Sequence, residues 1–90
     1  MKTVSIPDFV RGALWSYDIN RMDLERDKVR IITNVLNYGT KSATDWLRAT
    51  YSADDIASVV THPRSGEWNK KSLNFWSLIY QVTPQITERL

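Results

Sequence analysis

Apolar side chains recur at intervals of three and four residues along most of the chain, which is the spacing of one face of an α-helix. This periodicity predicts four main helices, over residues 24–38, 42–50, 53–61 and 70–81. Strand-like alternation is confined to residues 14–18, and no second strand exists elsewhere to pair with it. We therefore predict an all-α fold, built as a compact bundle of four main helices joined by short connections.

The two ends of the chain carry weaker patterns. Residues 1–7 are expected to form an extended tail ending at Pro7, followed by a short N-terminal helix or an extended segment that docks Trp15 onto the core. Thr83-Pro84 is expected to close the last helix, and residues 84–90 are expected to fray. Because a chain of 90 residues supports one hydrophobic core, we predict a single helical domain over residues 1–90.

The cleanest helical pattern is that of residues 24–38. Ile32 and Leu36 lie on its apolar stripe, and the polar side chains gather on the opposite arc. The polar arc comprises Arg26, Asp27, Arg30, Thr33, Asn34 and Asn37. Asp23 is the candidate N-cap of this helix, and Gly39 is expected to end it in a left-handed conformation. The candidate N-caps of the later helices are Thr40 or Ser42, Ser52, and Asn69 or Ser72.

Residues 70–81 differ from the other helices because large apolar side chains cover most of the circumference. Only Asn74, Ser77 and Gln81 form a narrow polar arc. A helix that is apolar almost all round is typically wrapped by its neighbours, so we predict that this one is the central core helix. The side chains predicted to form the core are Trp15, Ile32, Leu36, Trp46, Leu73, Phe75, Trp76 and Ile79.

Composition narrows the class of protein further. Hydrophobic residues make up 42% and charged residues 24% of the chain, which is ordinary globular usage. The absence of cysteine excludes disulfides, thiol catalysis and cysteine-ligated zinc, and favours the cytoplasm as the compartment. No apolar run approaches the length of a membrane span, so we expect no contact with a membrane.

The candidate catalytic side chains have simpler structural explanations. His62 is the single histidine and has neither a second histidine nor a cysteine to complete a metal site. Asp54 and Asp55 are adjacent on a helix, point in different directions, and suit the positive end of the helix dipole. No phosphate-binding loop or catalytic triad motif is present. We expect neither enzymatic activity, nor a cofactor, nor a metal.

Basic residues cluster at the start of the last helix. Arg64, Lys70 and Lys71 surround Trp68, and this combination can contact a protein partner or a phosphate backbone. The short helices within residues 42–81 could also contain a helix-turn-helix. However, a recognition helix should expose its N-terminal face, whereas here apolar side chains begin at Leu73. We therefore favour a protein partner at these four residues and keep nucleic acid as the alternative.

Several stretches resemble an uncharacterised family of small bacterial domains, over roughly residues 13–80. They are Leu14-Trp15-Ser16-Tyr17-Asp18, Val35-Leu36-Asn37-Tyr38-Gly39, Asp45-Trp46-Leu47, Tyr51 and Leu73-Asn74-Phe75-Trp76. Members of that family are frequently encoded beside nucleotidyltransferase-like toxins of the abortive-infection type. The resemblance therefore implies an antitoxin-like or accessory role, and it supplies no catalytic residue.

These observations lead to one expected function and one alternative. We expect a non-enzymatic, cytoplasmic protein-interaction module of bacteria that acts as the antitoxin-like partner of a toxin-like nucleotidyltransferase. The alternative is a small helix-turn-helix-like DNA-binding regulator that uses residues 42–81. Self-association stays open as well, because an aromatic-rich helix in so small a protein can leave an uncovered apolar patch.

Overall fold

The computed structural model describes residues 6–14, 21–64 and 66–85, and its regular elements are all helical. They are α1 (Asp8–Arg11), the short 3-10 helix η1 (Gly12–Leu14), α2 (Lys28–Tyr38), α3 (Lys41–Thr50), α4 (Ala53–Thr61) and α5 (Lys70–Tyr80). No strand occurs within those ranges. The predicted all-α class is confirmed. The expected docking of Trp15 falls on residues that lie outside the described ranges.

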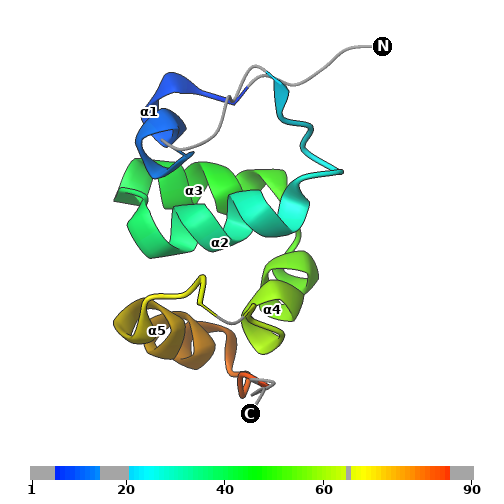
Figure 1. Ribbon diagram of the computed structural model, residues 1–90, viewed down its shortest axis with the longest axis vertical. Helices are drawn as coiled ribbons and strands as arrows, with labels where there is room; N and C mark the ends of the chain where they lie inside the picture. The colour runs from blue at the N-terminus through cyan, green and yellow to red at the C-terminus, as the bar shows by residue number, and fades with distance from the viewer. Residues whose placement is uncertain (1–5, 15–20, 65, 86–90) are drawn as a thin grey trace.

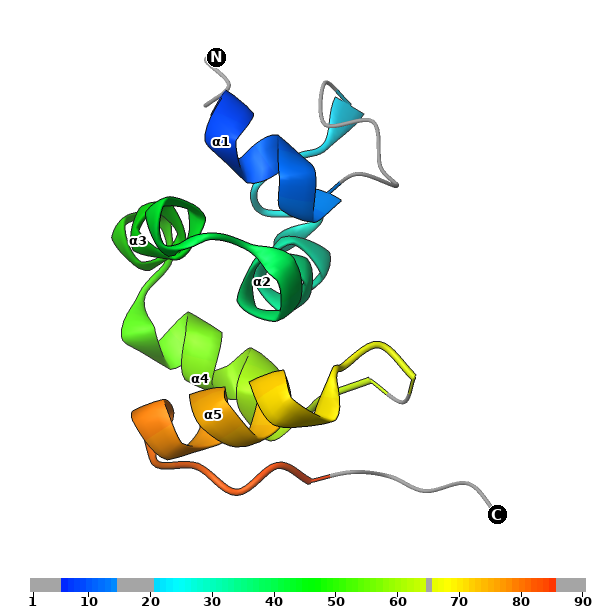
Figure 2. The ribbon, with the colours of Figure 1, turned by 90° about the vertical axis from the view of Figure 1, so that its left-hand side faces the viewer.

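The helices form three tiers. α1 and η1 lie on one side, α2 and α3 run together through the middle, and α4 and α5 lie on the other side (Figures 1 and 2). α2 is the central helix because it contacts η1, α3, α4 and α5. Its Ile31, Ile32 and Val35 side chains are fully buried. Thr33, expected on the polar arc, is buried as well.

The hydrophobic core is built mainly from the first four helices and the residues next to them. Around α2, the buried apolar side chains are Ile6, Val10, Ala13, Leu14, Ala43, Leu47, Tyr51, Ile56, Val59 and Val60. Ile6 was expected in an extended tail, yet it packs into this core. The Tyr51 hydroxyl donates a hydrogen bond of 2.7 Å to the Leu24 carbonyl, and burial raises the pKa of this phenol.

The central position predicted for residues 70–81 is wrong. α5 lies at the edge of the molecule against α4 and α2 (Figure 2), and its one buried side chain is that of Ser77. Of the predicted core, Ile32 and Leu36 are buried, Trp46, Leu73 and Trp76 pack partly buried against the core, and Phe75 and Ile79 are exposed. Apolar side chains cover most of the circumference of α5, but the neighbouring helices bury only one face of it.

The first turn predicted for the helix of residues 24–38 is not α-helical. The Asp23 carboxylate accepts the amides of Glu25 and Arg26 at 3.0 and 2.6 Å. The Asp27 carboxylate accepts the Asp23 amide at 2.9 Å. These reciprocal bonds hold residues 24–27 as a turn, so Asp23 caps that turn and α2 begins at Lys28.

The N-caps of the later helices include predicted candidates. Thr40, Ser52 and Asn69 each accept a backbone amide at the start of α3, α4 and α5. Gly39, however, is extended and not left-handed (φ −78°). A Cβ atom there would lie 2.6 Å from the Val35 carbonyl oxygen, so it is this close approach that requires glycine. A left-handed helix end is found instead at Gln81 (φ 55°), where α5 ends.

Candidate functional site

The inner side of α5 is a stripe formed by Leu73, Trp76, Ser77 and Tyr80. These positions follow the i, i+3, i+4, i+7 spacing of one helix face. The three larger side chains pack partly buried against the core. The Ser77 hydroxyl is buried but satisfied, because it donates a hydrogen bond of 2.8 Å to the Asn74 carbonyl. A small residue in the middle of this stripe lets α5 pack closely against the rest of the protein.

Trp76 connects this stripe to the end of α2. Its indole Nε1 donates a hydrogen bond of 3.0 Å to the Leu36 carbonyl. Its ring meets Phe75 edge to face at 4.9 Å and lies 6.2 Å from the Tyr80 ring. The Arg48 guanidinium of α3 lies 5.9 Å from the centre of the Tyr80 ring. The orientation of α5 is therefore specified by polar and aromatic contacts as well as by burial.

The opposite side of α5 is a second apolar stripe, the α5 outer face, which consists of Phe75, Leu78 and Ile79. At about 100° per residue these side chains lie half a turn from the inner stripe. They are exposed by 53%, 69% and 46%. An i, i+3, i+4 set of large apolar side chains is the pattern with which a helix packs against another protein surface. Sequence analysis missed this face, since it assigned both stripes of α5 to the core.

The four residues predicted to contact a partner lie next to α5, on the connection of residues 62–69 and in the first helical turn. Arg64, Lys70 and Lys71 are exposed and form a basic rim. Trp68 is partly buried against the core instead. Its Nε1 is buried and has no hydrogen-bond acceptor among the described residues. The structure thus places the three cations, but not the indole, on the accessible surface.

Asn37 of α2 holds the connection of residues 62–69 in place. Its side-chain amide donates to the Glu67 carbonyl at 3.0 Å, and its side-chain oxygen accepts the Asn69 amide at 2.9 Å. Asn69 in turn caps α5 by accepting the amides of Lys71 and Ser72. One side chain of α2 therefore sets where α5 begins, and with it the position of the basic rim.

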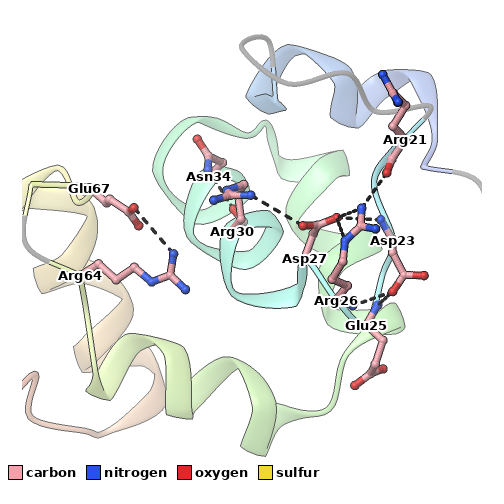
Figure 3. A network of polar contacts seen from close by, with 9 residues as sticks. All are labelled: Arg21, Asp23, Glu25, Arg26, Asp27, Arg30, Asn34, Arg64 and Glu67. Carbon is pink, nitrogen blue, oxygen red and sulfur yellow. Dashed lines mark hydrogen bonds and ion pairs between the residues drawn. The ribbon is translucent and has the colours of Figure 1, made fainter.

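A separate polar network surrounds the start of α2 (Figure 3). The Arg26 guanidinium donates two hydrogen bonds to the Asp27 carboxylate, from Nε at 3.2 Å and from a terminal nitrogen at 2.8 Å. A terminal nitrogen of Arg30 lies 3.7 Å from the other oxygen of the same carboxylate. Arg64 reaches toward this side of α2 and forms a long ion pair of 3.9 Å with Glu67. Two segments far apart in the sequence therefore bring three guanidinium groups together.

The charge of Asp27 is stabilised by its surroundings. Hydrogen bonds from the Arg26 guanidinium and the Asp23 amide, together with the nearby charge of Arg30, lower the pKa of the Asp27 carboxyl below its ordinary value of 3.8. The same contact with Asp27 raises the pKa of Arg26. Asp27 is therefore ionised at neutral pH and neutralises part of the positive charge around it.

This lowered pKa predicts a loss of stability in acid. A carboxyl whose pKa is lower in the folded state stabilises the protein fully above the unfolded value near 3.8, and this contribution is lost as the pH falls through the folded pKa. In urea unfolding measured across this range, Asp27→Asn should flatten the acid limb of the stability profile. Asp45→Asn, which removes an exposed ion pair with Lys41, should leave that limb unchanged. Equal acid limbs for wild type and Asp27→Asn would contradict the prediction.

Two further observations concern other classes of site. In the described part of the chain, no three side chains of His, Cys, Asp or Glu are grouped so that they could hold a metal ion. None of the helices described is long and apolar enough to cross a membrane.

Comparison with known protein families gives a match over more than half of the chain. The model of DUF6922, a family of unknown function, matches residues 9–60. The chain belongs to this family. The DUF6922 segment begins at the second residue of α1, includes η1, α2 and α3, and ends one residue before the end of α4, so α5 lies outside it. No curated protein and no solved structure matches the chain.

The limits of the DUF6922 segment separate the core from the candidate surfaces. The α2-centred core lies almost entirely within the matched residues, whereas Leu73-Asn74-Phe75-Trp76, the α5 outer face and the basic rim lie beyond them. The three-arginine network is divided, since Arg26 and Arg30 belong to the matched segment and Arg64 does not.

Proposed function

We propose that the chain is a non-enzymatic protein-interaction module of the bacterial cytoplasm and that the α5 outer face binds its partner. The observation that carries the proposal is the exposure of Phe75, Leu78 and Ile79 on one side of a helix whose other side is anchored to the core. Water around three adjacent large apolar side chains is unfavourable, and covering them provides binding free energy. The absence of cysteine supports the cytoplasm as the compartment.

The occupant that fits this face is an apolar groove with an acidic rim on a larger protein. α5 lies at the edge of the fold, so a groove can cover the outer face and both of its flanks. The helix carries Lys70 and Lys71 but no acidic residue. A second copy of the chain would bring no acidic residue on its own α5 to pair with these lysines.

The identity of the partner is proposed from the resemblance. Chains of this kind are expected beside nucleotidyltransferase-like toxins, so the proposed partner is such a toxin, and the proposed role is antitoxin-like. In that arrangement α5 docks into the toxin while the α2-centred core presents the helix. The acidic rim required of the toxin would face Lys70 and Lys71.

The DNA-binding alternative receives less support from the geometry. If α4 were the recognition helix, Asp54 and Asp55 in its first turn would face the phosphates. If α5 were that helix, it would follow a connection over residues 62–69, longer than the ~3–4 residues usual in a helix-turn-helix. Its exposed side would also be apolar.

The decisive experiment co-expresses the chain with the proposed nucleotidyltransferase-like partner and measures complex formation by calorimetry. We expect Leu78→Asp to weaken binding at least ~100-fold, since it places a charge at the centre of the face that the partner would cover in the complex. Because Leu78 is mostly exposed, the melting temperature of the free variant should change little. The control is Phe9→Asp in α1, since it places the same charge on another exposed large apolar side chain, outside the α5 outer face.

Each outcome has one interpretation. Loss of binding in Leu78→Asp but not in Phe9→Asp supports the α5 outer face as the docking surface. Equal affinities for wild type and Leu78→Asp would refute it, and the lack of any complex would refute the toxin partner. Concentration-dependent dimers of the free protein that Leu78→Asp abolishes would instead assign the face to self-association. Duplex DNA binding that is weakened by Lys70→Ala with Lys71→Ala would favour the regulator.

A further inference from the structure

Lys71 continues the α5 outer face toward the start of the helix. Lys71, Phe75 and Leu78 are spaced i, i+4 and i+7, so the three side chains leave α5 on the same side. All three are exposed. The Cα atoms of Lys71 and Phe75 lie about 6 Å apart along the helix axis. An ammonium group therefore borders the apolar face within about one helical turn of Phe75.

Lys70 lies on a different side of α5, although it is the next residue in the sequence. It shares the i, i+4, i+7 spacing with Asn74 and Ser77. That line of residues leads to Ser77, which is buried against the rest of the protein. Lys70 and Lys71 carry the same charge and are both exposed, but only Lys71 is aligned with the α5 outer face. The two lysines of the basic rim are therefore not equivalent for a partner that covers this face.

The charge of Lys71 is not compensated within the described part of the chain. None of the ion pairs there involves Lys71. The first turn of α5 contains no acidic residue, whereas the first turn of α4 contains Asp54 and Asp55. Because the N-terminal end of a helix is the positive end of its dipole, a cation there is unfavourable and an anion is favourable. A carboxylate supplied from outside would compensate both the ammonium group and the helix end.

We propose that Lys71 determines which partner the α5 outer face accepts, by pairing with an Asp or Glu side chain beside the pocket that receives Phe75. This inference rests on the proposed function and specifies the chemistry of the partner at one place. A surface without that carboxylate would cover the apolar side chains but leave the ammonium group desolvated and unpaired, so it would be rejected. The last turn of α5 carries no charge of its own. The pair with Lys71 therefore also fixes the direction in which α5 lies in the groove.

The role of Lys71 is tested on the complex with the proposed nucleotidyltransferase-like partner by measuring the affinity at two salt concentrations. We expect Lys71→Ala to weaken binding about tenfold at about 50 mM sodium chloride and less at about 500 mM, because salt screens exposed charges. Lys70→Ala is the matched control and should weaken binding less than about twofold. Both variants replace an exposed lysine in the first turn of α5 by alanine, so an effect on helix stability would be common to both.

The alignment of charge and apolar surface is tested on the free chain with anilinonaphthalene sulfonate, a fluorescent probe that joins apolar rings to a sulfonate anion. We expect Lys71→Ala to weaken binding of this probe about fivefold and Lys70→Ala to leave it unchanged. Phenylnaphthylamine, which has similar rings but no charge, should bind wild type and Lys71→Ala equally. Leu78→Asp should weaken the binding of both probes, because it places a charge in the apolar face that they share.

The outcomes separate this inference from the proposed function. Equal effects of Lys70→Ala and Lys71→Ala on the complex would overturn the role of Lys71, while a loss of binding in Leu78→Asp would still support the α5 outer face. An unchanged affinity of Lys71→Ala for the anionic probe would overturn it as well. If Leu78→Asp left the complex intact, the proposed function and the role of Lys71 would fail together. Duplex DNA binding that depends equally on both lysines would assign them to phosphate contacts instead.

Discussion

Ile32→Ala should lower the free energy of unfolding by about 2–5 kcal/mol, whereas Phe75→Ala should change it by less than about 0.5 kcal/mol. Ile32 is fully buried on the central helix α2, so its truncation removes apolar contacts and leaves a cavity. Phe75 was predicted to be equally central but is about half exposed on the α5 outer face. Urea unfolding followed by circular dichroism measures both values.

The comparison must be made at low protein concentration, because self-association would bury Phe75. Leu78→Ala is the matched control, since Leu78 belongs to the same face and is still more exposed. It should behave like Phe75→Ala. If both α5 variants lost as much stability as Ile32→Ala in the monomer, α5 would be covered on both sides and the described arrangement would be wrong.

Trp76→Ala should cost about 3 kcal/mol, at the lower end of the range for large aromatic residues because the ring is only partly buried. The substitution removes the packing of the inner stripe together with the hydrogen bond to the Leu36 carbonyl. Trp76→Phe keeps most of the ring contact and loses that bond, so it should cost about 1 kcal/mol. Thermal and urea unfolding of the two variants separates the two contributions.

Trp68→Phe is the control for the hydrogen bond of Trp76. The Nε1 atom of Trp68 is buried without an acceptor among the described residues, so its removal eliminates an unsatisfied donor and breaks no described bond. Trp68→Phe should therefore leave stability unchanged or raise it slightly. If Trp68→Phe were as destabilising as Trp76→Phe, indole size rather than hydrogen bonding would explain both results.

Local sequence signals predicted the helices well because helix formation depends on near neighbours. The 3.6-residue periodicity located α3, α4 and α5 to within a residue at each end. Thr40, Ser52 and Asn69 were recognisable as caps because a cap bonds amides only two or three residues away. The start of α2 was placed too early because the Asp27 carboxylate accepts the Asp23 amide and the Asp23 carboxylate accepts the Arg26 amide, which closes a turn first.

The candidate surfaces were predicted less well, because each depends on residues that are distant in the sequence. Phe75 and Ile79 are as apolar as Leu73 and Trp76, and nothing local distinguishes the stripe that meets α2 and α4 from the one that faces water. Lys70 and Lys71 could be recognised as an exposed basic rim from their place in the first turn. The convergence of Arg64 with Arg26 and Arg30 has no sequence signal, since it requires α4 to return the chain to α2.

The amino-acid sequence by itself determined the all-α class, the number and approximate ends of the main helices, and the apolar character of α5 on two sides. These properties follow from periodicity, capping and side-chain chemistry within a few residues. Only the tertiary structure decided that α2 is the central helix, that α5 lies at the edge with one apolar face uncovered, and that three arginines share a cleft. Burial is a property of the neighbours that a helix meets, and those neighbours are chosen by packing across the whole chain.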